Sequence, residues 1–289
     1  MSAEHKNWGI GPFCGRLWRY AEVESTNECA LRELAAGAAR HLDVHVAAQQ
    51  RAGRGRRGRI WDSPAGEGLY LSLLWRPERS SAKPNSPTQM TMAGGLAALD
   101  CVRELGVHAA RLKWPNDLVV ALETDAEAER VGHPAQPALP GAAHGLSTWE
   151  RAAKLAGVLI EARSDCAGSV VGIGLNVLQR QFPSELTQER PVTSLSLLGI
   201  GTQMRDVERE LLHQLASRLQ QTLEDPRGVA RDFLRATQLL DVPVEVEVAG
   251  VTHRGVLEEI DEHGYLHLAT SGERISLQLA HVGRLLPLL

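Results

Sequence analysis

The spacing of apolar residues switches from a helical period to period two near residue 242, and that switch limits the folds open to the chain. Over residues 206–223 apolar side chains recur four positions apart, which predicts an amphipathic helix with Asp206 as its cap and Pro226 beyond its end. From Val242 onward valines alternate with charged residues, and glycines separate further short runs. The sequence therefore predicts a helix-bearing part, residues 1–238, followed by a small all-β barrel, residues 239–289.

Both spacings also occur before residue 206. A capping box of Ser25 with Glu28 predicts the start of one helix, and small residues over 88–105 predict another, which Gly106 ends. Extended or apolar runs predict strands at residues 17–23, 44–48, 69–75, 111–114, 156–162 and 169–177. Such a mixture belongs to the α+β or the α/β class.

One internal stretch differs from the rest. Residues from about 123 to 148 contain several prolines and glycines and show no amphipathic period. We expect an exposed insertion there.

The composition excludes several classes of protein. A net charge of −4 with 43% hydrophobic and 23% charged residues is typical of a soluble globular protein. No run reaches the ~18 apolar residues of a membrane helix and no signal peptide is recognisable, so we expect a cytoplasmic protein without a membrane partner. The four cysteines form no CxxC pair, and no structural metal is expected.

A loop rich in arginine and glycine is the clearest candidate for ligand binding. Five arginines and three glycines occupy eight of the nine positions from Arg51 to Arg59. Glycine lets backbone N–H groups approach a ligand, and guanidinium groups donate in a fork that matches phosphate or carboxylate oxygens. A polyphosphate is the expected partner. The alternative is a solvated charge run or an RNA-binding segment, which the acidic balance of the chain disfavours.

Three further stretches place polar residues near strands. Asn116 and Asp117 follow a proline at a strand end, where they suit a ribose or a phosphate-bound Mg²⁺, with a plain turn as the alternative. Lys154 precedes an apolar run, where it either snorkels or neutralises a ligand anion. The alternating glycines before Asn176 would let something flat lie against a strand, or they mark a tightly packed one.

Together and in this order, these motifs resemble those of the biotin protein ligase family. The family pattern is matched at residues 25–27, 53–58, 113–117, 154–157 and 172–176. The resemblance extends from about Leu17 to the C-terminus. It implies an α+β fold, in which a catalytic domain like that of class II synthetases, a mixed sheet flanked by helices, precedes an SH3-like barrel. It also implies an enzyme that converts biotin and ATP to biotinyl-5′-AMP and transfers biotin to one lysine of the biotin carboxyl carrier protein of acetyl-CoA carboxylase.

The resemblance further implies roles for individual residues. Those implied to bind biotin are Ser25, Thr26, Asn27, Gln50, Arg54, Gly55, Arg56 and Lys154. Those implied to bind the nucleotide are Gly53, Trp61, Lys113, Asn116 and Asn176. Those implied in catalysis are Lys154, Arg54, Arg56 and Asp117, of which Asp117 is also the candidate Mg²⁺ ligand. ATP and Mg²⁺ would act as substrate and activator, and no tightly bound cofactor is implied.

The chain departs from the family pattern in two ways. The 36 residues 118–153 stand where the family usually has only a few. About 20 residues precede the biotin motif, too few for a helix-turn-helix domain, so we expect a monofunctional enzyme that does not bind DNA. A lipoate protein ligase, which shares the fold and the adenylation chemistry, is the alternative, although this arginine loop and C-terminal barrel are not expected of it.

Overall fold

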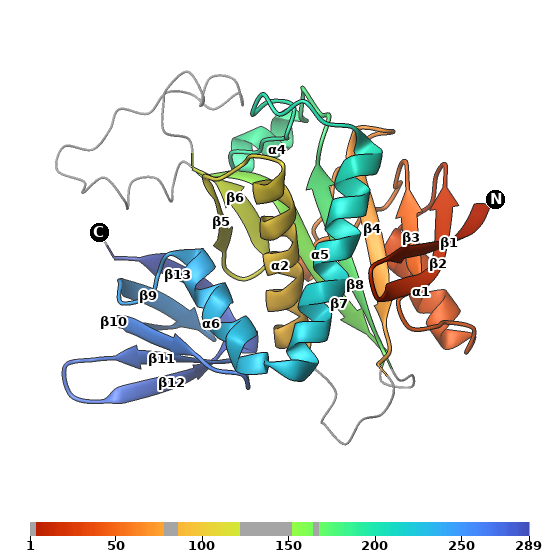
Figure 1. Ribbon diagram of the computed structural model, residues 1–289. Coiled ribbons are helices and arrows are strands. Elements are labelled where there is room, and N and C mark those ends of the chain that lie inside the picture. Colours follow the sequence, from red (N-terminus) through yellow and green to blue (C-terminus); the bar gives the residue numbers. More distant parts are fainter. Residues whose placement is uncertain (1–3, 78–85, 122–151, 164–167, 289) are drawn as a thin grey trace.

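The computed structural model describes residues 4–77, 86–121, 152–163 and 168–288, and the insertion expected at about 123–148 lies outside them. An eight-stranded mixed sheet forms the centre of the molecule, and a smaller antiparallel sheet follows it (Figure 1). The strands of the large sheet, in spatial order, are β1 (Glu4–Ile10), β2 (Phe13–Tyr20), β3 (Val44–Ala47), β4 (Gly68–Trp75), β8 (Ser169–Asn176), β7 (Ala153–Ala162), β6 (Asp117–Val120) and β5 (Ala110–Lys113). Of these neighbours, β2 and β3 run parallel, and the other pairs are antiparallel.

Helices cover both faces of the large sheet. On one face lies α2 (Pro87–Glu104), with α5 (Met204–Glu224) and α6 (Pro226–Thr237) packed beside it (Figure 1). There a Cβ at Gly94 of α2 would lie 2.8 Å from Val158 of β7. The opposite face carries α1 (Thr26–Ala35), whose Asn27 lies against Gly172 of β8. Side chains alternate across a strand, so one face of β8 packs the core while the other remains open to α1.

The starts of two helices correct the sequence-based expectations. Ser25 is the N-cap residue of α1, but its side chain makes no capping hydrogen bond, so the predicted capping box with Glu28 is wrong. Instead Ser25 is buried beside the cavity described below. The predicted cap of α5 is also wrong, because the helix begins at Met204 after Gln203 and Asp206 lies within its first turn.

The junction of α5 and α6 is another departure from the expected pattern. Pro226, expected only to follow the end of a helix, is the first residue of α6. Asp225 caps this helix by accepting a hydrogen bond from Gly228 N at 2.8 Å. Proline is well tolerated at the first helical position because the N–H it lacks would have no helical partner there. A stop signal and a start signal therefore coincide at one residue.

The small C-terminal β unit has the expected alternation, with Val244 and Val246 buried. Its strands, in spatial order, are β12 (Arg274–Gln278), β11 (Tyr265–Ala269), β10 (Val251–Ile260), β9 (Pro243–Val248) and β13 (Val282–Pro287). Its core is continuous with that of the large sheet. Trp114, after β5, packs edge-on against Phe233 of α6 and donates from Nε1 to the carbonyl of Val282 at 3.4 Å. The C-terminal sheet therefore sits close enough to contribute to the site.

Candidate active site

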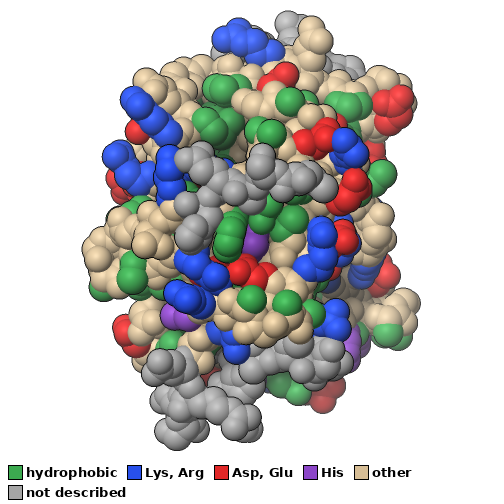
Figure 2. All heavy atoms as spheres, turned by 90° about the vertical axis from the view of Figure 1, so that its right-hand side faces the viewer, with side chains coloured by type: hydrophobic (Ala, Val, Ile, Leu, Met, Phe, Trp, Pro, Cys, Tyr) green, Lys and Arg blue, Asp and Glu red, His purple; other side chains and the backbone are tan. Residues whose placement is uncertain are grey.

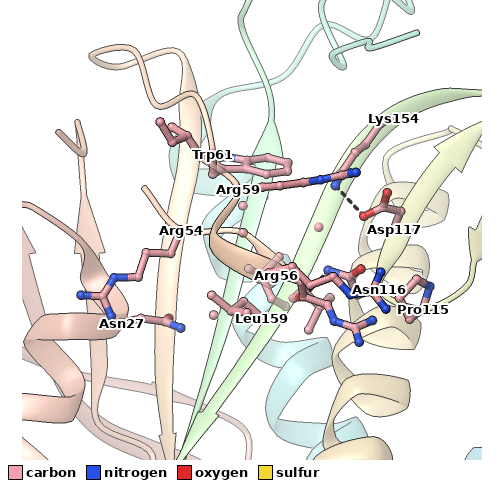
Figure 3. A pocket seen from close by; sticks show the side chains of 18 of the residues that line it. Asn27, Arg54, Arg56, Arg59, Trp61, Pro115, Asn116, Asp117, Lys154 and Leu159 are labelled. Atoms are coloured by element: carbon pink, nitrogen blue, oxygen red, sulfur yellow. Dashed lines mark hydrogen bonds and ion pairs between the residues drawn. The ribbon is translucent and has the colours of Figure 1, made fainter. Parts of the chain in front are cut away.

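A cavity of about 620 Å³ opens on the face of the large sheet that carries α1. Its floor consists of glycines on two neighbouring strands, Gly157 of β7 beside Gly172 and Gly174 of β8. The arginine–glycine loop, the turn between β5 and β6, and Lys154 of β7 surround the floor (Figure 3). Segments far apart in sequence therefore meet at one place.

One wall of the cavity is a chain of neutral hydrogen-bonding groups. Thr26 N donates to Gln50 Oε1 at 2.9 Å, and Gln50 Nε2 donates to Ser63 Oγ at 3.0 Å. The Ser72 hydroxyl lies 2.7 Å from Thr26 Oγ1 and 2.6 Å from Asn27 Oδ1. Thr26, Asn27 and Ser72 are all buried. Donors and acceptors held this way can recognise an uncharged polar group on a ligand. We call Thr26, Asn27, Gln50 and Ser72 the neutral wall.

The opposite side centres on a buried ion pair. Lys154 Nζ lies 2.5 Å from Asp117 Oδ1, and Asp117 Oδ2 lies 3.4 Å from Arg190 Nη1. Burial lowers the pKa of Lys154, the charge of Asp117 opposes that shift, and Arg190 adds to it. Lys154 Nζ also stands 5.1 Å from the centre of the Trp61 ring. A cation with so little solvent is poised to exchange its carboxylate partner for a ligand anion.

Further cations make this side of the cavity strongly positive. Burial lowers the pKa of Arg56, and the positive charge of the neighbouring Arg57 lowers it further. The cationic lining residues are Arg54, Arg56, Arg57, Arg59, Lys113, Lys154, Arg190 and Arg284, while the lining carboxylates are Asp117 and Glu189. By contrast, the face shown in Figure 2 carries basic and acidic side chains interspersed. Cations concentrated in a concave site favour a polyanionic ligand.

The turn between β5 and β6 is tied to β7 through Asn116. Its Nδ2 donates to the carbonyl of Val158 at 2.7 Å, and its carbonyl accepts from Val158 N at 2.9 Å. Asp117 is the first residue of β6, opposite Lys113 in the hairpin. Asn116 therefore holds the turn in place, and Asp117 faces Lys154 as a consequence.

The group that lies flat on the glycine floor is Trp61 of this chain. A Cβ at Gly174 would stand 2.4 Å from Trp61 Cε2, and one at Gly157 would stand 3.0 Å from Trp61 Cζ3. Only glycine at these positions leaves room for the indole. Within the described part of the chain the buried Nε1 of Trp61 has no hydrogen-bond partner, so it is available to a ligand.

Backbone hydrogen bonds within the arginine–glycine loop hold its two ends together. Gly55 N donates to the carbonyl of Arg59 at 2.7 Å, and Trp61 N donates to the carbonyl of Gly53 at 2.9 Å. A Cβ at Gly53 would lie 2.4 Å from the Trp61 carbonyl oxygen. Gly53 thus permits close approach of the backbone within the loop.

Twelve of the fourteen predicted site residues line the cavity, and the exceptions are Gly53 and Asn176. Asn176 is buried, where its Nδ2 donates to the carbonyl of Thr193 at 2.9 Å and its Oδ1 accepts from Gln179 at 3.3 Å. Thr193 N in turn donates to the carbonyl of Lys154 at 2.9 Å. In this structure Asn176 supports the segment beside Lys154, and its nucleotide contact remains a prediction.

Among the polar residues at or beside the cavity that sequence reasoning missed are Ser72, Glu161, Arg190 and Arg284. A signal existed for the first two, since Ser72 stands opposite Gly172 in the sheet and Glu161 is four positions along β7 from Gly157. Alternation along the strands places both on the glycine face. Arg190 and Arg284 belong to no motif, and their positions depend on tertiary packing.

Among the described residues, no helix is both apolar enough and long enough to cross a membrane. The same residues contain no group of three or more His, Cys, Asp or Glu side chains placed to hold a metal ion.

Residues 20–177 match the model of the biotin/lipoate A/B protein ligase family. The bifunctional ligase/repressor BirA of Salmonella typhimurium is 30% identical over 256 residues, which cover 86% of this chain and 68% of that protein. A biotin--[acetyl-CoA-carboxylase] ligase of Mycobacterium tuberculosis is 30% identical over 281 residues, covering 93% and 90% of the two chains.

The fold also has counterparts among solved structures. The biotin protein ligase of Aquifex aeolicus in complex with biotin and ATP superposes with a TM-score of 0.69, covering 94% of this chain and 98% of that one. The two chains are 23% identical, so this likeness concerns the fold.

Proposed function

Because the chain belongs to the biotin/lipoate A/B protein ligase family, we propose that it is a biotin–protein ligase that forms biotinyl-5′-AMP from biotin and ATP. It then transfers biotin to one lysine of the biotin carboxyl carrier protein of a carboxylase. The name of the mycobacterial relative gives acetyl-CoA carboxylase as the protein to which that enzyme joins biotin. One observation carries the proposal: a single cavity joins a neutral polar wall to a cationic wall. These are the environments that the two ends of biotin require.

Biotin would lie with its ureido group at the neutral wall. A ureido group offers two N–H donors and one carbonyl acceptor, which match the mixed donors and acceptors of Thr26 and Gln50. Its carboxylate would then point toward Lys154 across the apolar surfaces of Leu159 and Trp61. Lipoate has no ureido group and would form none of these hydrogen bonds with the wall, so the site should bind it much more weakly than biotin.

In the first reaction step a biotin carboxylate oxygen attacks the α-phosphorus of ATP. A P–O bond forms to give the mixed anhydride, and pyrophosphate leaves. Two anions must approach each other, so Lys154 and Arg56 would reduce their repulsion and stabilise the charge that spreads over the phosphoryl oxygens. Lys154 is buried and Arg56 is half-buried, and this reduced contact with water strengthens the interactions.

Mg²⁺ would accompany the nucleotide, with Asp117 as its protein ligand. Mg²⁺ commonly keeps most of its shell as water and substrate phosphate and takes only one or two carboxylates from the protein. Asp117 supplies one such carboxylate to the cavity, beside Lys154. When bound, the ion would neutralise charge on the phosphates. Asp117 would also orient Lys154 through their ion pair.

In the second step the carrier lysine, as a neutral amine, attacks the acyl carbon. A C–N bond forms and AMP leaves. No covalent enzyme intermediate is required. The arginine–glycine loop would cover the anhydride until the carrier arrives, since a released mixed anhydride would hydrolyse or acylate other lysines. In this scheme the catalytic domain comprises residues 1–238 and the C-terminal barrel residues 239–289, of which Arg284 lines the cavity.

The test is mass spectrometry of a biotin carboxyl carrier domain incubated with this protein, biotin, ATP and Mg²⁺. We expect one biotin adduct, none without ATP, and none with lipoate in place of biotin. Lipoate addition alone would transfer the assignment to lipoate ligation. No adduct with either substrate would refute the proposal.

A further inference from the structure

Glu161, near the end of β7, stands where the neutral wall meets the arginine–glycine loop. Its Oε2 accepts a hydrogen bond from Asn27 Nδ2 at 2.7 Å, and its Oε1 lies 3.3 Å from Arg54 Nη1. Asn27 and Arg54 lie side by side at one end of the cavity (Figure 3). Each carboxylate oxygen therefore serves a different segment of the chain.

We propose that Glu161 is a positioning residue that couples ligand binding at the neutral wall to the placement of the arginine–glycine loop. The inference rests on the biotin ligase function proposed above and extends it to the regulation of the same site.

Ser72 and Glu161 together fix the orientation of the Asn27 amide. Its Oδ1 lies 2.6 Å from the Ser72 hydroxyl, a donor, and its Nδ2 donates to Glu161. The amide already packs against β8, since Asn27 Oδ1 lies 2.2 Å from the place that a Cβ at Gly172 would take. It therefore cannot move away from these partners toward β8. Asn27 is buried, so an Nδ2 without an acceptor would carry the cost of an unsatisfied donor. Glu161 therefore determines which end of the amide faces Ser72.

Two carboxylates hold Arg54 of the arginine–glycine loop. Besides Glu161, its guanidinium reaches Glu28 of α1, with Nη2 at 2.8 Å from Oε2. Glycines flank Arg54 on both sides, so the local backbone has little stiffness of its own. Arg54 is 42% exposed, and either ion pair alone would stabilise the loop only weakly. Joined to the buried Asn27 through Glu161, the pair becomes part of a network.

Coupling follows from the shared carboxylate. A ligand that binds the neutral wall restrains Asn27 and thereby Glu161, which then holds Arg54 in a narrower range of positions. Linkage requires the reverse as well, so a well-placed loop tightens ligand binding at the wall. Loop closure would thus report that the biotin end of the cavity is filled before the anhydride forms.

The test measures loop accessibility in the full-length protein with trypsin, which cleaves after arginines 51–59. In wild type, saturating biotin should slow cleavage in the loop. Glu161→Gln keeps an oxygen that can accept from Asn27 but loses the charge that holds Arg54. The protection by biotin should fall about tenfold in this variant, in line with typical coupling energies, and by linkage biotin should still bind in calorimetry but with a Kd raised by up to about the same factor.

The matched control is Glu22→Gln. Glu22 pairs with Arg51 of the same loop on an exposed surface and belongs to neither wall of the cavity. This variant should keep the wild-type protection. A merely structural Glu161 would speed cleavage equally with and without biotin, and equal protection in Glu161→Gln and wild type would overturn the coupling.

A second variant covers a failure to fold. If Glu161→Gln lowers the thermal midpoint below the assay temperature, Glu161→Asp, which keeps the charge but shortens its reach, replaces it with the same expected loss. Wild type that binds biotin without gaining protection would also reject the coupling while leaving the proposed function intact. Wild type that does not bind biotin would remove both.

Discussion

At the scale of single residues, the site is built from side chains that are paired with one another. Lys154 is buried with Asp117, Trp61 lies on Gly174, and Asn27 bridges Ser72 and Glu161. Removing one member of such a buried pair leaves its partner without compensation, which costs more than the pair itself contributes. Substitutions here should therefore change function strongly.

Lys154 provides the first prediction at this scale. Lys154→Met keeps the apolar stem and removes the charge, and should lower the rate of biotin-dependent pyrophosphate exchange by ~10² to 10³. Lys154→Arg restores a cation of different shape and should retain more activity. Exchange at the wild-type rate in Lys154→Met would show that the charge is not used in the first step.

Gly174 provides the second. Its Cβ position is 2.4 Å from the Trp61 ring, so Gly174→Ala must displace the indole. We expect a change in tryptophan fluorescence and a loss of pyrophosphate exchange by about tenfold or more, because displacements near 1 Å in a site can cost ~10² in rate. Gly201→Ala is the matched control, since nothing lies within 4 Å of a Cβ there. A similar response of the two variants would argue against the glycine floor.

At the scale of elements, loops and helix ends carry signals that act locally. The arginine–glycine loop closes through its own backbone hydrogen bonds, as between Gly55 and Arg59, and then delivers Arg56 into the cavity. At the far side of the sheet, Asp225 begins α6 one residue after α5 ends. Substitutions in the loop and at this helix start should therefore act locally and leave the rest of the fold unchanged.

Arg56→Gly should impair retention of the adenylate. A glycine there removes a cation from the cavity and adds freedom to the loop, so the mixed anhydride would escape before the carrier arrives. We expect biotin on many proteins in a mixture, detected with streptavidin after electrophoresis. Labelling confined to the carrier in this variant would contradict the role of the loop in retention.

Asp225→Ala should destabilise the protein by ~1 kcal/mol, the usual effect of losing an N-cap hydrogen bond. Urea unfolding followed by circular dichroism would measure the change. Gln203→Ala is the control, because Gln203 occupies the N-cap of α5 without a side-chain hydrogen bond. Equal effects at the two positions would show that the bond to Gly228 adds nothing to stability.

At the scale of the whole molecule, the two sheets share one apolar core. Polar contacts reinforce that junction, since Gln89 Nε2 donates to the carbonyl of Glu262 at 2.6 Å and Arg227 lies 2.7 Å from the Glu262 carboxylate. Arg284 of the C-terminal sheet also lines the cavity. The C-terminal sheet is thus part of the site as well as of the core.

We accordingly expect the full-length protein to unfold in a single cooperative thermal transition. Removing residues 239–289 would expose the shared core, so the remaining chain should lose solubility. Scanning calorimetry tests the first statement through the agreement of calorimetric and van't Hoff enthalpies. Two resolved transitions would show that the two sheets fold independently.

The sequence predicted features that depend on neighbouring residues. Period two predicted the buried valines of β9, and period 3.6 predicted the apolar face of α5. Small residues followed by Gly106 predicted the end of α2 correctly, with Gly106 at φ +98°. Strand β1 and helix α6 were not predicted, because an edge strand carries little apolar alternation and Pro226 was interpreted only as a stop. Strand β2 was predicted only in its second half, from Leu17 onward.

The ordered motifs determined the family and most of the cavity lining, since twelve predicted residues converge there. Only the tertiary structure decided which of them face one another. The register of β4 against β8 placed Ser72 opposite Gly172, the packing of α1 brought Asn27 to Glu161, and the packing of the C-terminal sheet placed Arg284 at the site. Periodicity and turn signals are local properties of the chain, whereas strand register and helix packing join residues more than a hundred positions apart. The sequence therefore determines which chemical groups the site contains, and the fold determines which of these groups contact one another.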